Sequence, residues 1–250
     1  MIVDYRNDSW KLQPTEPINL PGADDPANYV DNTDDWVAFV NNERPAAPTE
    51  LGSDVTLATF NVLNYFTTTG EEWGCSNGYE DRAGDYVTAN NCTPRGAFHA
   101  DDLDRQEQKI VAAINQLDAS VVGLQEIENS GRLGKDRDQA VNDLVAALNA
   151  DAGTEKWAVV ESPSNLPANE DVIRLAFIYQ PDVVTPVGES KILIGNAAIA
   201  GTAREPLAQE FARADGEGDT FVAVNNHFKS KGSLSNSGDE DVYQGNNNLL

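Results

Sequence analysis

Residues 121–129 read VVGLQEIEN, and this stretch decides which fold the chain can adopt. Its first four residues are apolar, and the residues on either side of them are polar. This pattern is typical of a short strand buried on both faces. Residues 101–117 place apolar side chains on one helical face and most charged side chains off it, and residues 139–149 carry a second apolar stripe. The pattern therefore predicts a buried strand with an amphipathic helix before it and another after it.

Further strands are predicted around these elements. β-branched and aromatic residues gather between Pro, Gly, Asp or Asn in five segments, which are residues 55–60, 157–160, 172–179, 183–187 and 221–225. A strand, helix, strand, helix order that gives way to successive strands favours a mixed sheet covered by helices. We therefore predict an α/β fold of the α+β kind.

The chain changes character before residue 54. Residues 2–13 predict one or two short strands, whereas residues 15–53 are rich in Pro, Asp and Asn and resemble a linker. Residues 244–250 show no closing element. We interpret residues 1–14 as the tail of a preceding small β domain, 15–53 as a linker and 54–250 as the N-terminal part of a larger domain.

The chain is strongly acidic, with 41 Asp and Glu against 17 Lys and Arg and a formal net charge of -24. Such a surface repels polyanions, but salt screens charges beyond about 8 Å, so local cations or a bound metal ion can still hold a phosphate in a cleft. Solubility in a salty or extracellular medium explains most of the carboxylates. No apolar run approaches the roughly 18 residues of a membrane span, and residues 1–10 lack the pattern of a signal peptide.

Two cysteines, Cys75 and Cys92, lie in a stretch rich in Gly, Asn, Asp and Tyr that has no helix or strand periodicity. A disulfide that closed this loop would stabilise the fold by about 3 kcal/mol. It would also imply an oxidising compartment, so we expect an extracellular or periplasmic protein. Two free thiols are the alternative, and a zinc site is disfavoured because no second Cys or His pair accompanies them.

Polar side chains at three predicted strand ends are candidates for catalysis. Asn61 can ligate a cation or anchor a turn. Glu126 follows the apolar strand, where a carboxylate needs a positive partner such as a divalent metal ion, unless it pairs at the surface. His227 can transfer a proton at a phosphodiester, and Lys229 and Lys231 just beyond it would stabilise charge on the phosphate. A histidine satisfied at a strand end beside two solvated lysines is the structural alternative.

Together these strings resemble the endonuclease/exonuclease/phosphatase superfamily, the DNase I-like fold, and most closely its secreted bacterial nuclease branch. They are ATFNVLNYF at 58–66, RGA at 95–97, RQ at 105–106, VVGLQEIEN at 121–129, residues 173–179 and NHFKSKG at 226–232. The resemblance implies an αβ sandwich of mixed, largely antiparallel sheets with outer helices, whose C-terminal part is missing from this chain. It also implies that residues 1–14 end an OB-like domain.

The resemblance further implies a role for each candidate residue. Asn61 and Glu126 would contact a catalytic Mg²⁺ or Mn²⁺ ion, and a structural Ca²⁺ ion is a further candidate. His227 would transfer a proton at the phosphate, and Asn226 would bind substrate. Arg174 lies on a strand that faces the cleft in relatives, so phosphate binding and a structural ion pair are both open for it.

The implied function is metal-dependent hydrolysis of phosphodiester bonds in nucleic acid, with DNA favoured over RNA, by a secreted protein that has further domains upstream and downstream. The chain departs from the family pattern because it lacks the downstream Asp-x-Asn and Asp-His motifs, and with them the base that activates water. Two alternatives stay open. One is a phosphoesterase of the same fold that acts on lipids or small phosphoesters, and the other is a catalytically dead binding module of a larger secreted protein.

Overall fold

The computed structural model describes residues 2–6, 9–13, 49, 51–195 and 203–228. The chain divides into two compact units, Met1–Ala46 and Ala47–Leu250. In the first unit, β1 (Ile2–Arg6) and β2 (Ser9–Gln13) pair as an antiparallel hairpin, so the predicted N-terminal strands are confirmed. Most of the linker predicted at 15–53 lies outside the described residues.

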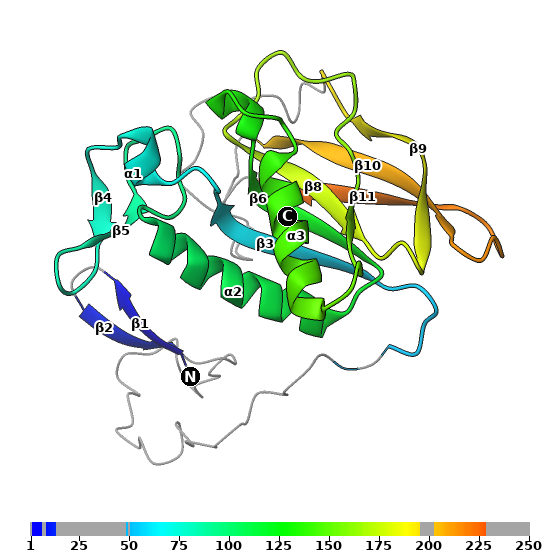
Figure 1. Ribbon diagram of the computed structural model, residues 1–250, viewed down its shortest axis with the longest axis horizontal. Coiled ribbons are helices and arrows are strands. Elements are labelled where there is room, and N and C mark those ends of the chain that lie inside the picture. The colour runs from blue at the N-terminus through cyan, green and yellow to red at the C-terminus, as the bar shows by residue number, and fades with distance from the viewer. Residues whose placement is uncertain (1, 7–8, 14–48, 50, 196–202, 229–250) are drawn as a thin grey trace, which may run out of the picture. The chain divides into compact units, whose positions relative to one another are not determined.

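The second unit contains a four-stranded and a three-stranded sheet (Figure 1). The four-stranded sheet has the order β3-β6-β8-β7, with parallel pairing between β3 and β6 and antiparallel pairing elsewhere. The three-stranded sheet is antiparallel, in the order β11-β10-β9. The predicted α+β class with mixed, largely antiparallel sheets is therefore confirmed. The strand bounds are β3 (Leu57–Tyr65), β6 (Val121–Glu128), β7 (Ala158–Val159), β8 (Ile173–Tyr179), β9 (Val184–Ile192), β10 (Arg204–Arg213) and β11 (Phe221–His227).

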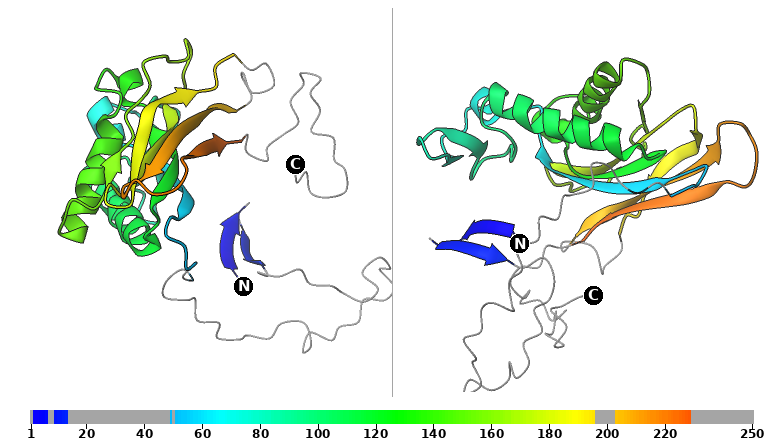
Figure 2. Two further views of the ribbon diagram at one scale, coloured as in Figure 1. Left: turned by 90° about the vertical axis from the view of Figure 1, so that its right-hand side faces the viewer. Right: turned by 90° about the horizontal axis from the view of Figure 1, so that it is seen from below.

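Two helices, α2 (Ala100–Leu117) and α3 (Gln139–Ala152), cover one face of the four-stranded sheet, and the three-stranded sheet packs on its other face (Figure 2). Val122 and Leu124 of β6 belong to the core under the helices, whereas Val121 belongs to the core between the sheets. The strand is therefore buried on both faces, as its continuous apolar run predicts.

One buried amide joins the two sheets. The Asn225 side chain of β11 is 4% exposed, and its Nδ2 donates to the carbonyls of Leu124 (2.9 Å) and Ala176 (3.0 Å). Its Oδ1 accepts a hydrogen bond from Gln125 Nε2 at 2.5 Å. A side chain at Gly123 would collide with this amide, since an added Cβ would lie 3.0 Å from Asn225 Cγ. Glycine at position 123 thus allows the sheets to approach closely.

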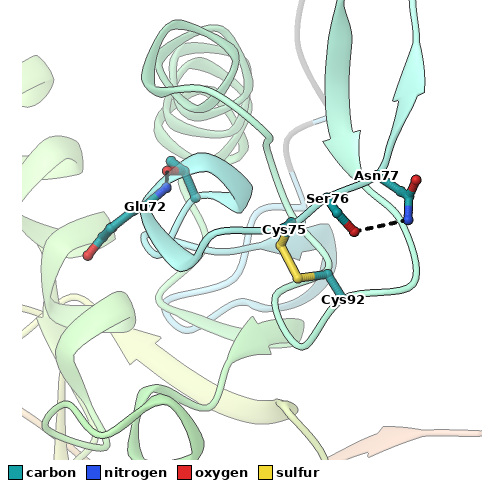
Figure 3. Close-up of a disulfide and its surroundings, with 6 residues drawn as sticks. Glu72, Cys75, Ser76, Asn77 and Cys92 are labelled. Carbon is teal, nitrogen blue, oxygen red and sulfur yellow. Dashed lines mark hydrogen bonds between the residues drawn. A yellow bond between two sulfur atoms is a disulfide. The ribbon is translucent and has the colours of Figure 1, made fainter.

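A small insert between β3 and α2 carries the disulfide. It contains α1 (Gly70–Trp73) and the hairpin of β4 (Gly78–Glu80) and β5 (Tyr86–Ala89). Cys75 and Cys92 are bonded, with their Cα atoms 5.8 Å apart (Figure 3). Next to them, Asn77 Nδ2 donates to Ser76 Oγ. The bond closes the loop that carries the β4–β5 hairpin, which the sequence analysis did not predict.

The structure also differs from the sequence-based expectations. Strand β10 was not predicted, because its sequence REPLAQEFAR mixes helix formers and charged residues with only a weak alternation. Glu126 was expected just past a strand end, but β6 continues to Glu128 through an irregularity in its pairing with β8. A short 3₁₀ helix, η3 (Ser130–Leu133), follows it. In the described part of the chain, no helix has the length and apolar character needed to span a membrane.

We expect Asn225→Ala to lower the free energy of unfolding by about 2–4 kcal/mol. The substitution leaves buried hydrogen-bonding groups of Gln125, Leu124 and Ala176 without their partner. Urea unfolding measures the change. Asn226→Ala is the matched control, since Asn226 is the exposed neighbour on the same strand, and its effect should stay within about 0.5 kcal/mol. Equal effects of the two substitutions would contradict the role of Asn225.

We expect the double substitution of Cys75 and Cys92 by serine to lower the free energy of unfolding by about 3 kcal/mol, the value expected for closing a loop of this size. Mass spectrometry after alkylation provides the direct test of the bond. The unreduced protein should take up no alkylating agent, and the reduced protein should take up two equivalents. Uptake of two equivalents without reduction would show that the bond is absent.

Candidate active site

The candidate site lies where β3 and β6 end side by side. The two strands are parallel, so their C-terminal ends meet at one edge of the sheet. Both ladders are irregular there, with register shifts between Asn61 and Tyr65 in β3 and between Leu124 and Ile127 in β6. Leu63, Asn64 and Glu126 adopt left-handed backbone conformations, with φ of 54°, 51° and 65°. Such conformations are unfavourable for residues such as leucine and glutamate, whereas glycine and asparagine tolerate them, and they concentrate at functional sites.

Three candidate residues meet at this edge. Asn61 Nδ2 donates to Glu126 Oε1 at 2.9 Å, and His227 Nε2 lies 3.5 Å from the same oxygen. The backbone N–H of Asn64 donates to Glu126 Oε2 at 3.0 Å, while Asn61 Oδ1 accepts from the N–H of Leu63 at 2.8 Å. The Glu126 and His227 side chains are mostly buried, at 18% and 17% exposure. The structure thus brings together Asn61, Glu126 and His227, as the sequence analysis expected.

The oxygen atoms of Glu126 and Asn61 at this edge are of the type that binds hard divalent cations. Within the described residues, His227 is the only ionisable group at ion-pair distance from Glu126, so no lysine or arginine among them pairs with this carboxylate. Asn61 Oδ1 adds a neutral oxygen. Mg²⁺ prefers such oxygen ligands, and one or two carboxylates suffice because it keeps several waters. No group of three or more His, Cys, Asp or Glu side chains suited to a metal ion occurs among the described residues.

Arg204 and Asp171 complete the charges around His227. Arg204 lies opposite His227 in the β10–β11 register and hydrogen-bonds to Asp171, which also accepts a hydrogen bond from Arg95 at 2.8 Å. Burial lowers the pKa of His227, the charge of Arg204 lowers it further, and Glu126 and Asp171 oppose both effects. The net pKa lies below the ordinary value, so His227 is neutral at neutral pH. Sequence reasoning missed Arg204 because it missed β10.

Asp171 is held ionised between its two arginines. Burial raises the pKa of its carboxyl group, but the hydrogen bond from the Val172 N–H and the charges of Arg95 and Arg204 outweigh that effect, so the pKa lies below its ordinary value. This carboxylate therefore fixes two guanidinium groups near the candidate site.

Arg174 forms a buried ion pair, one of the two arrangements that the sequence left open for it. Strand alternation places it with Ala176 and Ile178 on the helix-covered face of the sheet, and its guanidinium pairs with Asp138 at 2.6 Å. Burial lowers the pKa of Arg174 to about 10, and Asp138 opposes the shift. The structural ion pair left open by the sequence is therefore the arrangement observed.

The other residues that the sequence analysis proposed for substrate binding are Asn226, Lys229 and Lys231. Asn226 is exposed, and its Nδ2 donates to the carbonyl of Val224 at 3.4 Å, on the opposite face of β11 from Asn225. Lys229 and Lys231 lie outside the described residues. Gln106, which the sequence analysis did not single out for a role, donates from Nε2 to the carbonyls of Val62 (3.1 Å) and Leu63 (2.8 Å). It thereby fastens the left-handed turn of β3 to α2.

Comparisons with known proteins add little to this geometry. No family model matches the chain, and no curated protein matches it. Among solved structures, the crystal structure of ANGEL2, a 2',3'-cyclic phosphatase, aligns with 48% of this chain and 30% of its own, at 13% identity and a TM-score of 0.32. Its complex with adenosine-2',3'-vanadate aligns over 69% and 40%, at 11% identity and a TM-score of 0.36. The chain thus matches less than half the length of these structures, and the likeness is too weak to assign a family or an activity.

We expect the two histidines to titrate on opposite sides of the ordinary histidine pKa of about 6.5. The hydrogen bond from His99 to Glu71 raises the pKa of His99, whereas burial and Arg204 lower that of His227. Arg204→Gln should therefore raise the pKa of His227 and leave that of His99 unchanged. Proton NMR titration of the chelator-treated protein measures both values.

The matched control is Arg213→Gln, which removes another arginine of β10 that pairs with Asp54 and Asp215. It should leave the His227 titration unchanged. A His227 pKa above that of His99, or one that falls in Arg204→Gln, would contradict the assigned electrostatics.

Proposed function

We propose that this chain hydrolyses phosphodiester bonds in nucleic acid, with DNA as the favoured substrate, and that it uses a divalent cation held at Glu126 and Asn61. One observation carries the proposal. Three strands that are far apart in sequence bring the Asn61 amide and the His227 imidazole to the Glu126 carboxylate. Asn61 Nδ2 lies 2.9 Å and His227 Nε2 3.5 Å from Glu126 Oε1. The strained backbone at Glu126 supports a functional use of this arrangement.

The residues of the chain have distinct tasks in this proposal. Glu126 and Asn61 would hold the cation, whose charge would stabilise the negative phosphate when bound. His227 is neutral at neutral pH and can donate or accept a proton at Nε2. Arg204, on the neighbouring strand, would stabilise developing charge on the phosphate. The family resemblance assigns water activation to a downstream Asp-His pair, which these 250 residues do not contain.

A second candidate substrate is a phosphodiester in a lipid headgroup. Two exposed apolar side chains favour it, because Leu63 is 75% and Phe228 76% exposed, and both are close in sequence to the candidate residues. Exposed apolar side chains beside a phosphoesterase site suit acyl chains as well as nucleobases. The disulfide supports a secreted or periplasmic location for either activity.

The test uses the full-length product of the gene that encodes this chain. Supercoiled plasmid should be nicked with Mg²⁺ and left intact with excess chelator. Glu126→Gln should remove the metal-dependent rate, and His227→Ala should lower the rate by about 10²- to 10⁴-fold, the usual contribution of a proton-transferring group. Circular dichroism should show that both variants stay folded.

Glu155→Gln, an exposed carboxylate beyond the end of α3, is the matched control and should retain full activity. Sphingomyelin vesicles are assayed in parallel. Full activity in Glu126→Gln and His227→Ala would refute the site, and metal-dependent cleavage of the lipid but not of plasmid would replace the nucleic-acid substrate with the lipid.

A further inference from the structure

A groove of about 610 Å³ adjoins the candidate site, with which it shares Asn61. The end of β3, from Phe60 to Asn64, forms one wall and α2 forms another. The third wall comes from the disulfide-closed insert, through Val87, Thr88 and residues 95–97. Its volume lies in the range of pockets that bind small organic ligands.

The groove combines an apolar floor with a cationic rim. Phe60, Val62, Val87 and Ile110 line its interior, and Arg95, Arg105 and Lys109 stand along it, with Asp102 as the one carboxylate in the lining. The lining thus has more cationic than anionic side chains, whereas the whole chain has a net charge of -24. A ligand with an apolar body and a negative charge therefore fits the groove by charge complementarity.

The three cationic side chains of the groove differ in whether they already form ion pairs. Arg105 pairs with Asp101 and Asp102, and Arg95 pairs with Asp171. Lys109 is exposed and forms no ion pair with the other described residues. Its ammonium group is thus the rim charge most available to a ligand phosphate.

Leu63 lines the groove and has an unusual conformation and exposure. Its backbone is left-handed, at φ 54°, and its side chain is 75% exposed, although both features are unfavourable for leucine. The turn is nevertheless fixed, because Asn61 Oδ1 accepts from the Leu63 N–H and Gln106 Nε2 donates to the Leu63 carbonyl. A rigidly presented apolar side chain beside the Asn61 amide suits the flat face of a nucleobase.

We propose that this groove binds the nucleoside next to the phosphate at Glu126 and Asn61. Leu63 packs against the base, and Lys109 pairs with the flanking phosphate. The inference rests on the proposed function and deepens it, since it makes the base itself a determinant of binding. It also assigns the disulfide-closed insert a role in recognition, because the insert supplies one wall.

The test compares thymidine 5'-monophosphate with 2-deoxyribose 5-phosphate, which has the same phosphate and sugar type but no base. Binding to this chain is measured by NMR titration in excess chelator, so that it needs neither a metal ion nor turnover. The nucleotide should bind about ten-fold more tightly. Leu63→Asn should remove about three- to ten-fold of that preference, as expected for the loss of one apolar contact.

Asparagine tolerates the left-handed backbone, so Leu63→Asn keeps the turn. Leu57→Asn is the matched control, because Leu57 is a 52% exposed leucine on the same strand outside the groove, and it should change nothing. Lys109→Ala should weaken both ligands by a similar factor of about three and reduce the salt dependence of binding. Lys191→Ala, an exposed lysine outside the groove, should leave both affinities unchanged.

Equal affinity for the two ligands, or a preference unaffected by Leu63→Asn, would overturn the proposal. Binding of sphingomyelin vesicles that depends on Leu63, without a preference for the nucleotide, would overturn it in favour of a lipid surface.

The failure of the groove proposal can be distinguished from the failure of the proposed enzymatic function. A nucleotide preference that depends on Leu63, in a protein whose full-length product cleaves no phosphodiester, supports the groove and refutes the enzymatic function. Cleavage that depends on Glu126, without a base preference, refutes the groove alone.

Discussion

The break in the ladder between β6 and β8 is the constraint on which the candidate site depends. Regular pairing stops between Leu124 and Ile127, and the backbone turns left-handed at Glu126. A break of this kind disrupts the ladder locally, and buried backbone carbonyls need hydrogen-bond partners. Asn225 of the opposite sheet contacts the ladder directly before the break, since its Nδ2 donates to the carbonyls of Leu124 and Ala176, the last regular pair. The interaction that joins the sheets therefore lies next to the irregular segment that carries Glu126.

The candidate site is assembled from supports that lie outside it. Gln106 on α2 fastens the turn at Leu63, and the Asn64 N–H within that turn holds Glu126 Oε2. On the other side, Asp171 holds Arg204 beside His227. Glu126 and Arg204 are thus each oriented by a group on another element, and rigid sites depend on such support.

Local charge and overall charge oppose each other in this protein. The chain carries a large excess of carboxylates, yet arginines and a lysine gather around the candidate site and its groove. Salt screens the distant carboxylates over about 8 Å, whereas a phosphate in the groove would be in direct contact with the cations. An acidic surface and an anionic ligand are therefore compatible, provided that the positive groups stay fixed where they are.

The sequence by itself determined the elements whose patterns are strong. The apolar run at 121–124 and the helical stripes of α2 and α3 were readable, because burial imposes a periodicity. Asn61, Glu126 and His227 were readable as polar residues that follow apolar runs, although β3 and β6 continue beyond Asn61 and Glu126. The cysteine pair was readable for a different reason, since two cysteines in an irregular stretch leave few alternatives.

Tertiary structure alone decided what depends on pairing between distant segments. Strand β10 carries polar residues such as the buried Gln209, so its propensity is weak and only the neighbouring strands make it a strand. Asn225 and Asn226 are identical side chains, and the register of β11 determines that one is buried and the other exposed. Arg174 faces the helices for the same reason, because a strand turns alternate side chains to opposite faces and no local signal says which face lies near the cleft.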